Sequence, residues 1–581
     1  MNRPGHRASA QGVVLLLFAV AIWLRSIDLW RPVDGRVREA WRECDIAAVA
    51  RNFCAEGMNI FYPRIDWRGD GPGFAEMEFP ALSYGIALLY KTFGFHEQLG
   101  RIIPFLFSIG TLWIFLLLAK KLLPPRASLL ALAFFVMSPL AIRVSNSLQP
   151  ESIMLFFLIA AVYAFIRWLE ERSWKWYWLA AGITACALLA KLNSAHIGLL
   201  FGALLFMHQG VRSLRSWRVW VLALLAVLPA ALWYLHAHHL WLTYHNSLGL
   251  SNEYHWIGWD FFTNPRFVAG ILRIELLFVW MPLGWLVGAY AILRGRWRGT
   301  SVALLWMLSV LAYYVAACRT TSEDWAIYYH IASVPPVALL FGLGADSAFP
   351  KAWPRGTGGL ILAGAVALLA VVARLVLGSA PSIPTAIAAA MIGGVAATVL
   401  AASTAKGAAR GLRPLRRLGQ LAVFFCVASS LIFCGFRIAK DLHPSHMQTV
   451  YECAREVKPY IPPGELIVAS GGHKADEDGY PLAINAPYLF YWLGHKGFNI
   501  AIEEQSVAAL ESLASRGAHL FVAERDALAE KAGFEAEMRA HFPLVVENRA
   551  LEVFALVVDA SQVDLTIPSQ NSTALIEETP R

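Results

Sequence analysis

The stretch Trp41–Tyr84, WRECDIAAVARNFCAEGMNIFYPRIDWRGDGPGFAEMEFPALSY, is a long polar-rich interval that directly follows the first apolar run of the chain. Apolar residues in its first part recur at the spacing of one helix face: Ile46, Val49, Ala50 and Phe53. Polar residues fill the remaining face, so the pattern predicts a helix that lies on a membrane surface. Glycines and prolines between Pro63 and Pro80 prevent the helix from continuing and predict a loop that folds back. Two acidic pairs bracket this loop: Glu43/Asp45 and Glu76/Glu78.

The composition is that of a polytopic membrane protein. Of the 581 residues, 57% are hydrophobic and 15% are charged, and the mean hydropathy is +0.51. Apolar runs of roughly 17–25 residues, long enough to span a bilayer, begin near residues 12, 102, 127, 151, 174, 192, 217, 267, 301, 327, 358, 384 and 419. The sequence therefore predicts an α-helical membrane protein with about thirteen transmembrane helices.

The distribution of Lys and Arg predicts the orientation of these helices, because basic residues in short loops mark the cytoplasmic side. With a cytoplasmic N-terminus, the inner segments hold basic clusters such as Lys120/Lys121/Arg126, Arg212/Arg215/Arg218 and Arg294/Arg296/Arg298. The loop Trp41–Tyr84 and everything after about Phe436 then lie outside the cytoplasm. The net charge of +8 follows this topology and does not indicate a nucleic-acid partner.

Three regions are predicted along the chain. Residues 1–440 form the transmembrane region, with a first outer loop at about 30–100. Residues 441–560 alternate short strand-like and helix-like segments, as in VAALESLASRG followed by AHLFVAE, and predict a small extracytoplasmic α/β domain with a largely parallel sheet. Residues 561–581 are rich in Ser, Thr, Glu and Pro and predict a disordered tail.

Polar residues at the outer ends of the spans are candidates for substrate binding. The turn SPLAIRVSNSLQPESIMLFF places Arg143 and Glu151 close together at the membrane edge, where ionisable groups often have a function. A simpler interpretation is an interfacial turn whose Arg143 extends to the lipid headgroups. Lys191 opposes the positive-inside trend, and it could extend in the same way or pair with a lipid phosphate.

Two aromatic-rich outer segments remain. Tyr329 and His330, at the start of a span, could bind an isoprenoid phosphate or a sugar, or form an ordinary aromatic belt around a hydrogen-bonded histidine. The loop from about His236 to Pro265 has five histidines, which raises the possibility of a divalent metal. No cysteine or adjacent carboxylate completes a recognised site, so no metal ligand and no definite cofactor are predicted.

Several features together resemble the C-type glycosyltransferase superfamily, in the branch of dolichyl-phosphate-mannose protein mannosyltransferases and bacterial aminoarabinose transferases. They are an Asp-bearing helix in the first outer loop, a loop that ends in Glu-Phe-Pro, an outer turn that reads Gln-Pro-Glu before a Phe-rich span, and an extracytoplasmic tail. The resemblance covers about residues 10–345. It implies a bacterial inner-membrane enzyme of cell-envelope glycosylation that transfers a sugar, with inversion, from a polyprenyl-phosphate donor to an extracytoplasmic acceptor.

The resemblance also implies the catalytic residues. Asp45 matches the acidic base of the first outer loop, and Glu78, directly before Phe79-Pro80, matches the second acidic position. The aminoarabinose enzymes resemble Glu-Lys-Pro-Pro where this chain has Glu-Phe-Pro-Ala, so the lysine is absent here. Lys191, Arg143 or His330 could supply the missing cation.

Transfer of a sugar from a polyprenyl phosphate requires a carboxylate and one or two cations. A polyprenyl phosphate is a competent leaving group, so the protein has to deprotonate an incoming hydroxyl and stabilise the departing charge. Two other classes stay open at this point: a transporter or flippase of lipid-linked sugars, and a scaffolding subunit whose outer domain binds a cell-wall polymer. Transporters often contain inverted repeats, and no internal repeat is visible in this sequence.

Overall fold

The computed structural model describes residues 4–36, 40–249, 261, 263–281, 284–294, 298–349 and 445–556. The chain divides into two compact units. The first comprises Met1–Pro63 and Ala75–Pro444, and the second comprises Arg64–Phe74 and Ser445–Arg581. The tip of the first outer loop therefore belongs to the C-terminal unit, which the sequence did not predict.

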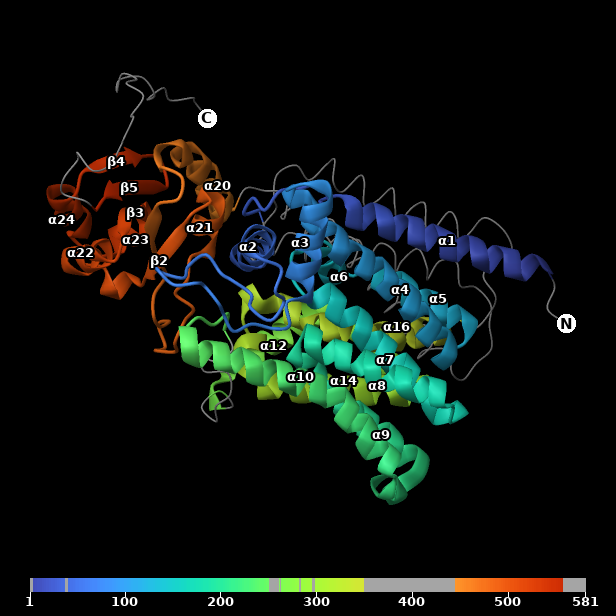
Figure 1. Ribbon diagram of the computed structural model, residues 1–581. Helices are drawn as coiled ribbons and strands as arrows, with labels where there is room; N and C mark the ends of the chain where they lie inside the picture. The colour runs from blue at the N-terminus through green and yellow to red at the C-terminus, as the bar shows by residue number, and fades with distance from the viewer. Residues whose placement is uncertain are drawn as a thin grey trace, which may run out of the picture. The chain divides into compact units, whose positions relative to one another are not determined.

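The first unit is a bundle of helices (Figure 1). Its main helices are α1 (Pro4–Ser26), α2 (Ala40–Glu56), α3 (Ala81–Phe93), α4 (Ile102–Leu122), α5 (Pro125–Met137), α6 (Pro139–Val144), α7 (Glu151–Glu171), α8 (Trp174–Ala190), α9 (Ile197–Gln209), α10 (Trp217–Tyr244), α12 (Pro265–Ile274), α13 (Gly284–Arg294), α14 (Arg298–Ala316) and α16 (Val334–Ala348). The 3₁₀ segments η2 (Leu192–His196) and η5 (Asp324–Ser333) precede α9 and α16.

Helix α16 forms the centre of the bundle, because it is buried along nearly its whole length and packs against α5, α13 and α14. Small residues allow this close approach. A Cβ atom at Gly342 would lie 2.4 Å from the carbonyl oxygen of Ala127 on α5, and one at Gly344 would lie 2.2 Å from that of Val287 on α13. The glycines in this helix therefore serve helix packing.

Ten of the apolar runs fall within the described residues, and each coincides with a helix of this unit. Among the described residues, six helical segments are long and apolar enough to cross a membrane, and the bent pair Pro265–Val279 and Gly284–Arg294 raises the number to seven if it is one span. Shorter apolar helices include Gln11–Ser26 and Pro125–Met137. The runs near residues 358, 384 and 419 and the tail 561–581 lie outside the described residues, so the total of thirteen stays a prediction.

Helix α2 differs from a surface helix in its polar face. Both of its faces are buried, including the polar side chains of Glu43, Asp45 and Asn52, so the helix does not expose a polar face as a surface helix would. Helix α3 packs against it, and the Ser83 hydroxyl donates to the carbonyl of Ile46 at 3.1 Å. The apolar periodicity correctly predicted a helix here, but the polar residues of its other face are buried against other parts of the protein.

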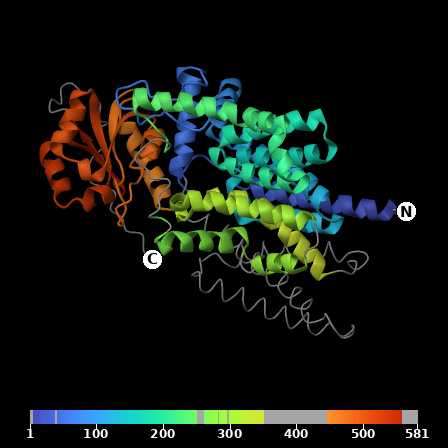
Figure 2. The same ribbon diagram turned by 90° about the horizontal axis from the view of Figure 1, so that it is seen from below.

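The C-terminal unit is an α/β domain, drawn in orange and red in Figure 2. Its described strands form a five-stranded sheet in the order β2-β1-β3-β5-β4. The strands are β1 (Leu466–Ser470), β2 (Lys496–Ile500), β3 (Ala518–Glu524), β4 (Leu544–Glu547) and β5 (Leu551–Ala555). The helices are α20 (His446–Val457), α21 (Pro487–Leu493), α22 (Val507–Ser515), α23 (Arg525–Glu530) and α24 (Phe534–His541).

The sheet is mixed rather than largely parallel. Strand β1 pairs in parallel with β2 and β3, whereas β5 pairs antiparallel with β3 and β4. The short connection between β4 and β5 accounts for the antiparallel pairing of these two strands, since only antiparallel neighbours can be joined by so few residues. The Asn548 side chain closes that turn by accepting from the amides of Ala550 and Leu551.

Candidate active site

Helix α2 directs Glu43 and Asp45 to opposite sides. Glu43 and Asp45 are two positions apart, which on an α-helix is a rotation of about 200°. Arg101 donates to both carboxylate oxygens of Glu43, at 3.0 and 2.9 Å, and also to the backbone carbonyls of Arg31, Pro32 and Asn146. Burial alone would raise the pKa of Glu43, but Arg101 outweighs it and holds the pKa below its usual value. Glu43 is thus an ionised structural residue that fixes α2.

Asp45 faces a second buried arginine. Arg42, one helical turn earlier on the same face, approaches an Asp45 oxygen to 4.0 Å. The same guanidinium binds both carboxylate oxygens of Glu78 at 2.8 Å each. All three side chains are at least 90% buried. The structure therefore places Asp45 and Glu78 beside one guanidinium, that of Arg42, a residue that the sequence did not single out.

Lys191 extends this cluster. Its ammonium forms an ion pair with Glu151 and lies 4.3 Å from the ring centre of Tyr329 and 5.1 Å from that of Tyr328. Burial would raise the pKa of Glu78, but Arg42 and then Lys191 lower it below its usual value. Five of the predicted site residues, Asp45, Glu78, Glu151, Lys191 and Tyr329, therefore share one electrostatic environment with Arg42.

Helix α10 contacts the residues on both sides of Glu78 in the loop. Trp233 donates its indole N–H to the carbonyl of Met77 at 3.0 Å and packs edge-on against Phe79, with 5.0 Å between ring centres. Glu76 is buried and accepts from the Ser247 hydroxyl at 2.7 Å, and its backbone bonds to Asn246 and Leu248. Glu76 is therefore not a solvated loop residue, because its carboxylate ties the loop to the segment after α10.

His330 has its own buried partners, separate from the contacts described above. His330 is fully buried, and its ring nitrogens contact a carboxylate oxygen of Glu275 at 2.7 Å and the carbonyl of Thr321 at 2.6 Å. Ser333 donates to the same oxygen of Glu275 at 2.8 Å. This arrangement agrees with the simpler interpretation, a hydrogen-bonded core histidine. Arg143 is half-buried near the end of α6.

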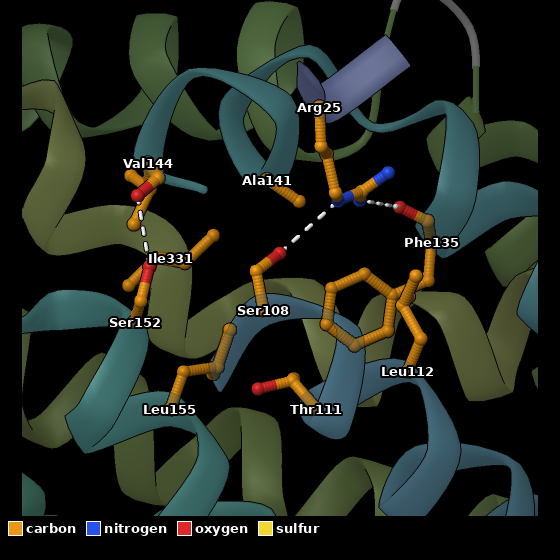
Figure 3. A pocket seen from close by; sticks show the side chains of 10 residues that line it. All are labelled: Arg25, Ser108, Thr111, Leu112, Phe135, Ala141, Val144, Ser152, Leu155 and Ile331. Carbon is orange, nitrogen blue, oxygen red and sulfur yellow. Dashed lines mark hydrogen bonds between the residues drawn. The ribbon is translucent and has the colours of Figure 1, made fainter. Parts of the chain in front are cut away.

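Another buried arginine was missed by sequence reasoning and has a structural role. Arg25, at the end of α1, donates to the Ser108 hydroxyl at 3.1 Å and to the last carbonyls of α5, those of Val136 and Phe135, at 3.1 and 3.4 Å (Figure 3). A cation at this end of a helix is favourable because of the helix dipole. The adjoining cavity has a volume of about 10 Å³, room for roughly one water molecule and not for a sugar.

No group of three or more His, Cys, Asp or Glu side chains is arranged to hold a metal ion within the described part of the chain. In the histidine-rich segment, His236 contacts the carbonyl of Phe61 at 2.7 Å and His238 lies 3.6 Å from a Glu76 oxygen. His255 falls outside the described residues. Between the two carboxylates of the cluster, the positive charge is supplied by Arg42.

A sequence-family model described as dolichyl-phosphate-mannose-protein mannosyltransferase matches residues 75–234. The matched range contains Glu78, Arg143, Glu151 and Lys191 and ends before the η5 tyrosines; Arg42 and Asp45 precede it. No curated protein sequence matches the chain.

Solved structures with a similar fold include ArnT from Cupriavidus metallidurans in the apo state, with 15% identity, a TM-score of 0.57, and coverage of 94% of this chain and 98% of that one. The same protein bound to undecaprenyl phosphate has the same identity and coverage and a TM-score of 0.55. The oligosaccharyltransferase AglB from Archaeoglobus fulgidus, in complex with an inhibitory peptide and a dolichol-phosphate, has 11% identity, a TM-score of 0.51, and coverage of 92% and 71%. At these identities the structural likeness concerns the fold.

Proposed function

We propose that this chain, a membrane glycosyltransferase of the C-type superfamily, transfers a monosaccharide from a polyprenyl-phosphate donor to an extracytoplasmic lipid, polysaccharide or protein. Two of the similar structures contain undecaprenyl phosphate or a dolichol-phosphate, which supports a lipid-phosphate donor here. The observation that carries the proposal is the buried cluster of Asp45, Arg42, Glu78 and Lys191, which combines carboxylates and cations in one place.

Asp45 is the proposed base. As the acceptor hydroxyl attacks the anomeric carbon, its proton passes to an Asp45 oxygen and the new C–O bond forms. The bond from the anomeric carbon to the phosphate oxygen breaks at the same time, and the polyprenyl phosphate leaves with the electron pair. Attack opposite the leaving group inverts the anomeric configuration. Asp45 is assigned this role because it matches the acidic base of the first outer loop in the resemblance to the C-type glycosyltransferases. Glu43 and Glu78 are each bound through both carboxylate oxygens by an arginine, which gives them structural and orienting roles.

Arg42 and Lys191 are the proposed cations for the departing phosphate. They take the place of the lysine that the aminoarabinose enzymes have after this glutamate, where the present chain has Phe79. Glu78 then orients Arg42 instead of acting as a second base. Tyr329 packs on Lys191 and Glu151 pairs with it, so both would orient the ammonium.

The proposed location is a bacterial inner membrane, with a cytoplasmic N-terminus and the C-terminal domain outside. This orientation rests on the positive-inside pattern. Residues 64–74 and 445–556 belong to one compact unit, which supports placing the first outer loop and the C-terminal domain on the same side of the membrane. An even number of spans then separates them, as in the thirteen-span prediction.

The test is an assay of the purified protein with a panel of polyprenyl-phosphate sugars and candidate acceptors, in which free polyprenyl phosphate is quantified. We expect acceptor-dependent release from at least one donor. A transporter or flippase would move the donor between leaflets of a proteoliposome without breaking the sugar–phosphate bond, so the same assay distinguishes the two. No observation in the described residues favours the transporter alternative.

A further inference from the structure

The tip of the first outer loop is a compact structure with a closed neck. At the neck, the amide of Ala75 donates to the carbonyl of Pro63 at 3.0 Å, and that of Ile65 donates to the carbonyl of Gly73 at 2.9 Å. Between these bonds, Arg64 and Phe74 form an antiparallel bridge. The two ends of the segment, residues 63–65 and 73–75, are therefore held side by side. The chain before the first end comes from α2, and the chain after the second end continues to Glu78.

The tip pairs with an edge strand of the C-terminal sheet. Strand β2 is at the end of the strand order, so its outer backbone groups have no strand partner within the described sheet. The loop supplies two bonds to it: the amide of Gly69 donates to the carbonyl of Gly497 at 2.7 Å, and the amide of Gly497 donates to the carbonyl of Asp66 at 3.1 Å.

Side chains extend this pairing. Arg516 donates to both carboxylate oxygens of Asp70, at 3.2 and 2.9 Å, and its guanidinium lies 4.7 Å from the ring centre of Phe498. Gly69 has a φ of +62°, and a Cβ there would lie 3.0 Å from the Phe498 ring. A glycine is therefore required at this position by both its backbone conformation and the close ring.

We propose that the C-terminal domain is a positioning element of the active site, which acts by holding the tip of the loop that carries Glu78. Glu78 follows Phe74, the last residue of the docked segment, by four positions, and Glu78 orients Arg42. The chain near Glu78 is thus held at two points. Trp233 of α10 binds Met77, and β2 of the C-terminal domain binds the loop tip. This inference rests on the proposed role of the Arg42–Glu78 pair.

The first test combines Gly69→Val with hydrogen exchange and turnover. A side chain at Gly69 is strained by the positive φ and meets Phe498, so docking should weaken by about tenfold or more. We expect amide exchange in residues 64–74 to accelerate by that factor and turnover to fall by roughly 3- to 10-fold. The matched control is Gly464→Val in the same domain, which has a φ of +90° but no atom within 4 Å of its Cβ position. It should leave both readouts unchanged.

A charge exchange provides a second test that avoids backbone strain. Asp70→Arg or Arg516→Asp alone places like charges together at an exposed site, and we expect exchange in the loop to rise by roughly two- to fivefold. The double variant restores an opposite-charge pair and should return both exchange and turnover to near the native values. Rescue of this kind would not follow if either residue had a separate role.

The outcomes separate the proposals. Unchanged loop exchange in Gly69→Val would overturn the docking, and faster exchange with unchanged turnover would overturn the positioning role. If the native protein released no polyprenyl phosphate with any donor, the proposed function would fail while the exchange data would still decide whether the loop docks on β2.

Discussion

Arg42 donates from one guanidinium nitrogen to both carboxylate oxygens of Glu78, 2.8 Å away in each case, and the pair is buried. This relationship links α2, which carries Asp45, to the loop before α3, which carries Glu78. Because removing one partner of a buried ion pair leaves an uncompensated charge, the pair fixes the geometry of the site as well as its charge.

The first prediction concerns this ion pair. Arg42→Gln leaves the Glu78 carboxylate buried without its main partner, so we expect a loss of about 3–5 kcal/mol in the free energy of unfolding. The double variant Arg42→Gln/Glu78→Gln removes both charges and should recover part of that stability, but turnover should stay low because a cation is missing. Thermal unfolding in detergent and the donor assay measure the two effects. A stable and active Arg42→Gln protein would contradict the assigned role.

The second prediction concerns pH. Burial raises the pKa of Glu78, but Arg42 and Lys191 lower it below its usual value of 4.5. A carboxyl with a lowered pKa in the folded state is ionised at neutral pH, and its stabilising effect is lost only as the pH falls through that lowered value. We therefore expect the residual activity of Glu78→Gln, measured between about pH 5 and pH 8, to fall toward acid pH in the same way as that of the native protein. If the acid side of the pH–activity profile shifted or disappeared in this variant, Glu78 itself would titrate in the reaction.

The third prediction concerns Lys191. If its ammonium binds the donor phosphate, Lys191→Gln should lower kcat/KM for the donor by roughly 10- to 100-fold, the range for a charge-assisted hydrogen bond. Lys191→Arg should retain part of the activity. The control is Glu151→Gln, which removes the partner carboxylate but keeps the cation, and it should affect donor KM much less. The measurement is steady-state kinetics at varied donor concentration, which gives kcat and KM for the donor. A folded Lys191→Gln protein with native donor kinetics would contradict the role of Lys191 and leave Arg42 as the only proposed phosphate ligand.

The sequence predicted the membrane class and the ten apolar runs that coincide with helices in the described residues, and it named both Asp45 and Glu78 as site residues. It could not separate Asp45 from Glu43, because both are acidic residues on one helix and only the tertiary partner Arg101 distinguishes them. Arg42 was missed although a signal existed: it precedes Asp45 by three positions and therefore shares its helix face.

Other features depended on partners that no local pattern reveals. The docked loop tip joins Asp70 to a residue 446 positions away, Arg516. The burial of Glu76 depends on Ser247, far along the chain, and the glycine-rich composition of its loop resembled that of a solvated segment. The histidine of η5 looked like a phosphate ligand because its partner, Glu275, belongs to another segment.

The most direct test of the central claim compares the native protein with Asp45→Asn in the donor assay. The amide keeps the shape and hydrogen-bonding capacity of the side chain but cannot accept the acceptor proton, so turnover should fall by about 10²–10⁴ while donor binding changes little. Release of polyprenyl phosphate at near-native rates by a folded Asp45→Asn protein would contradict the assignment of Asp45 as the base.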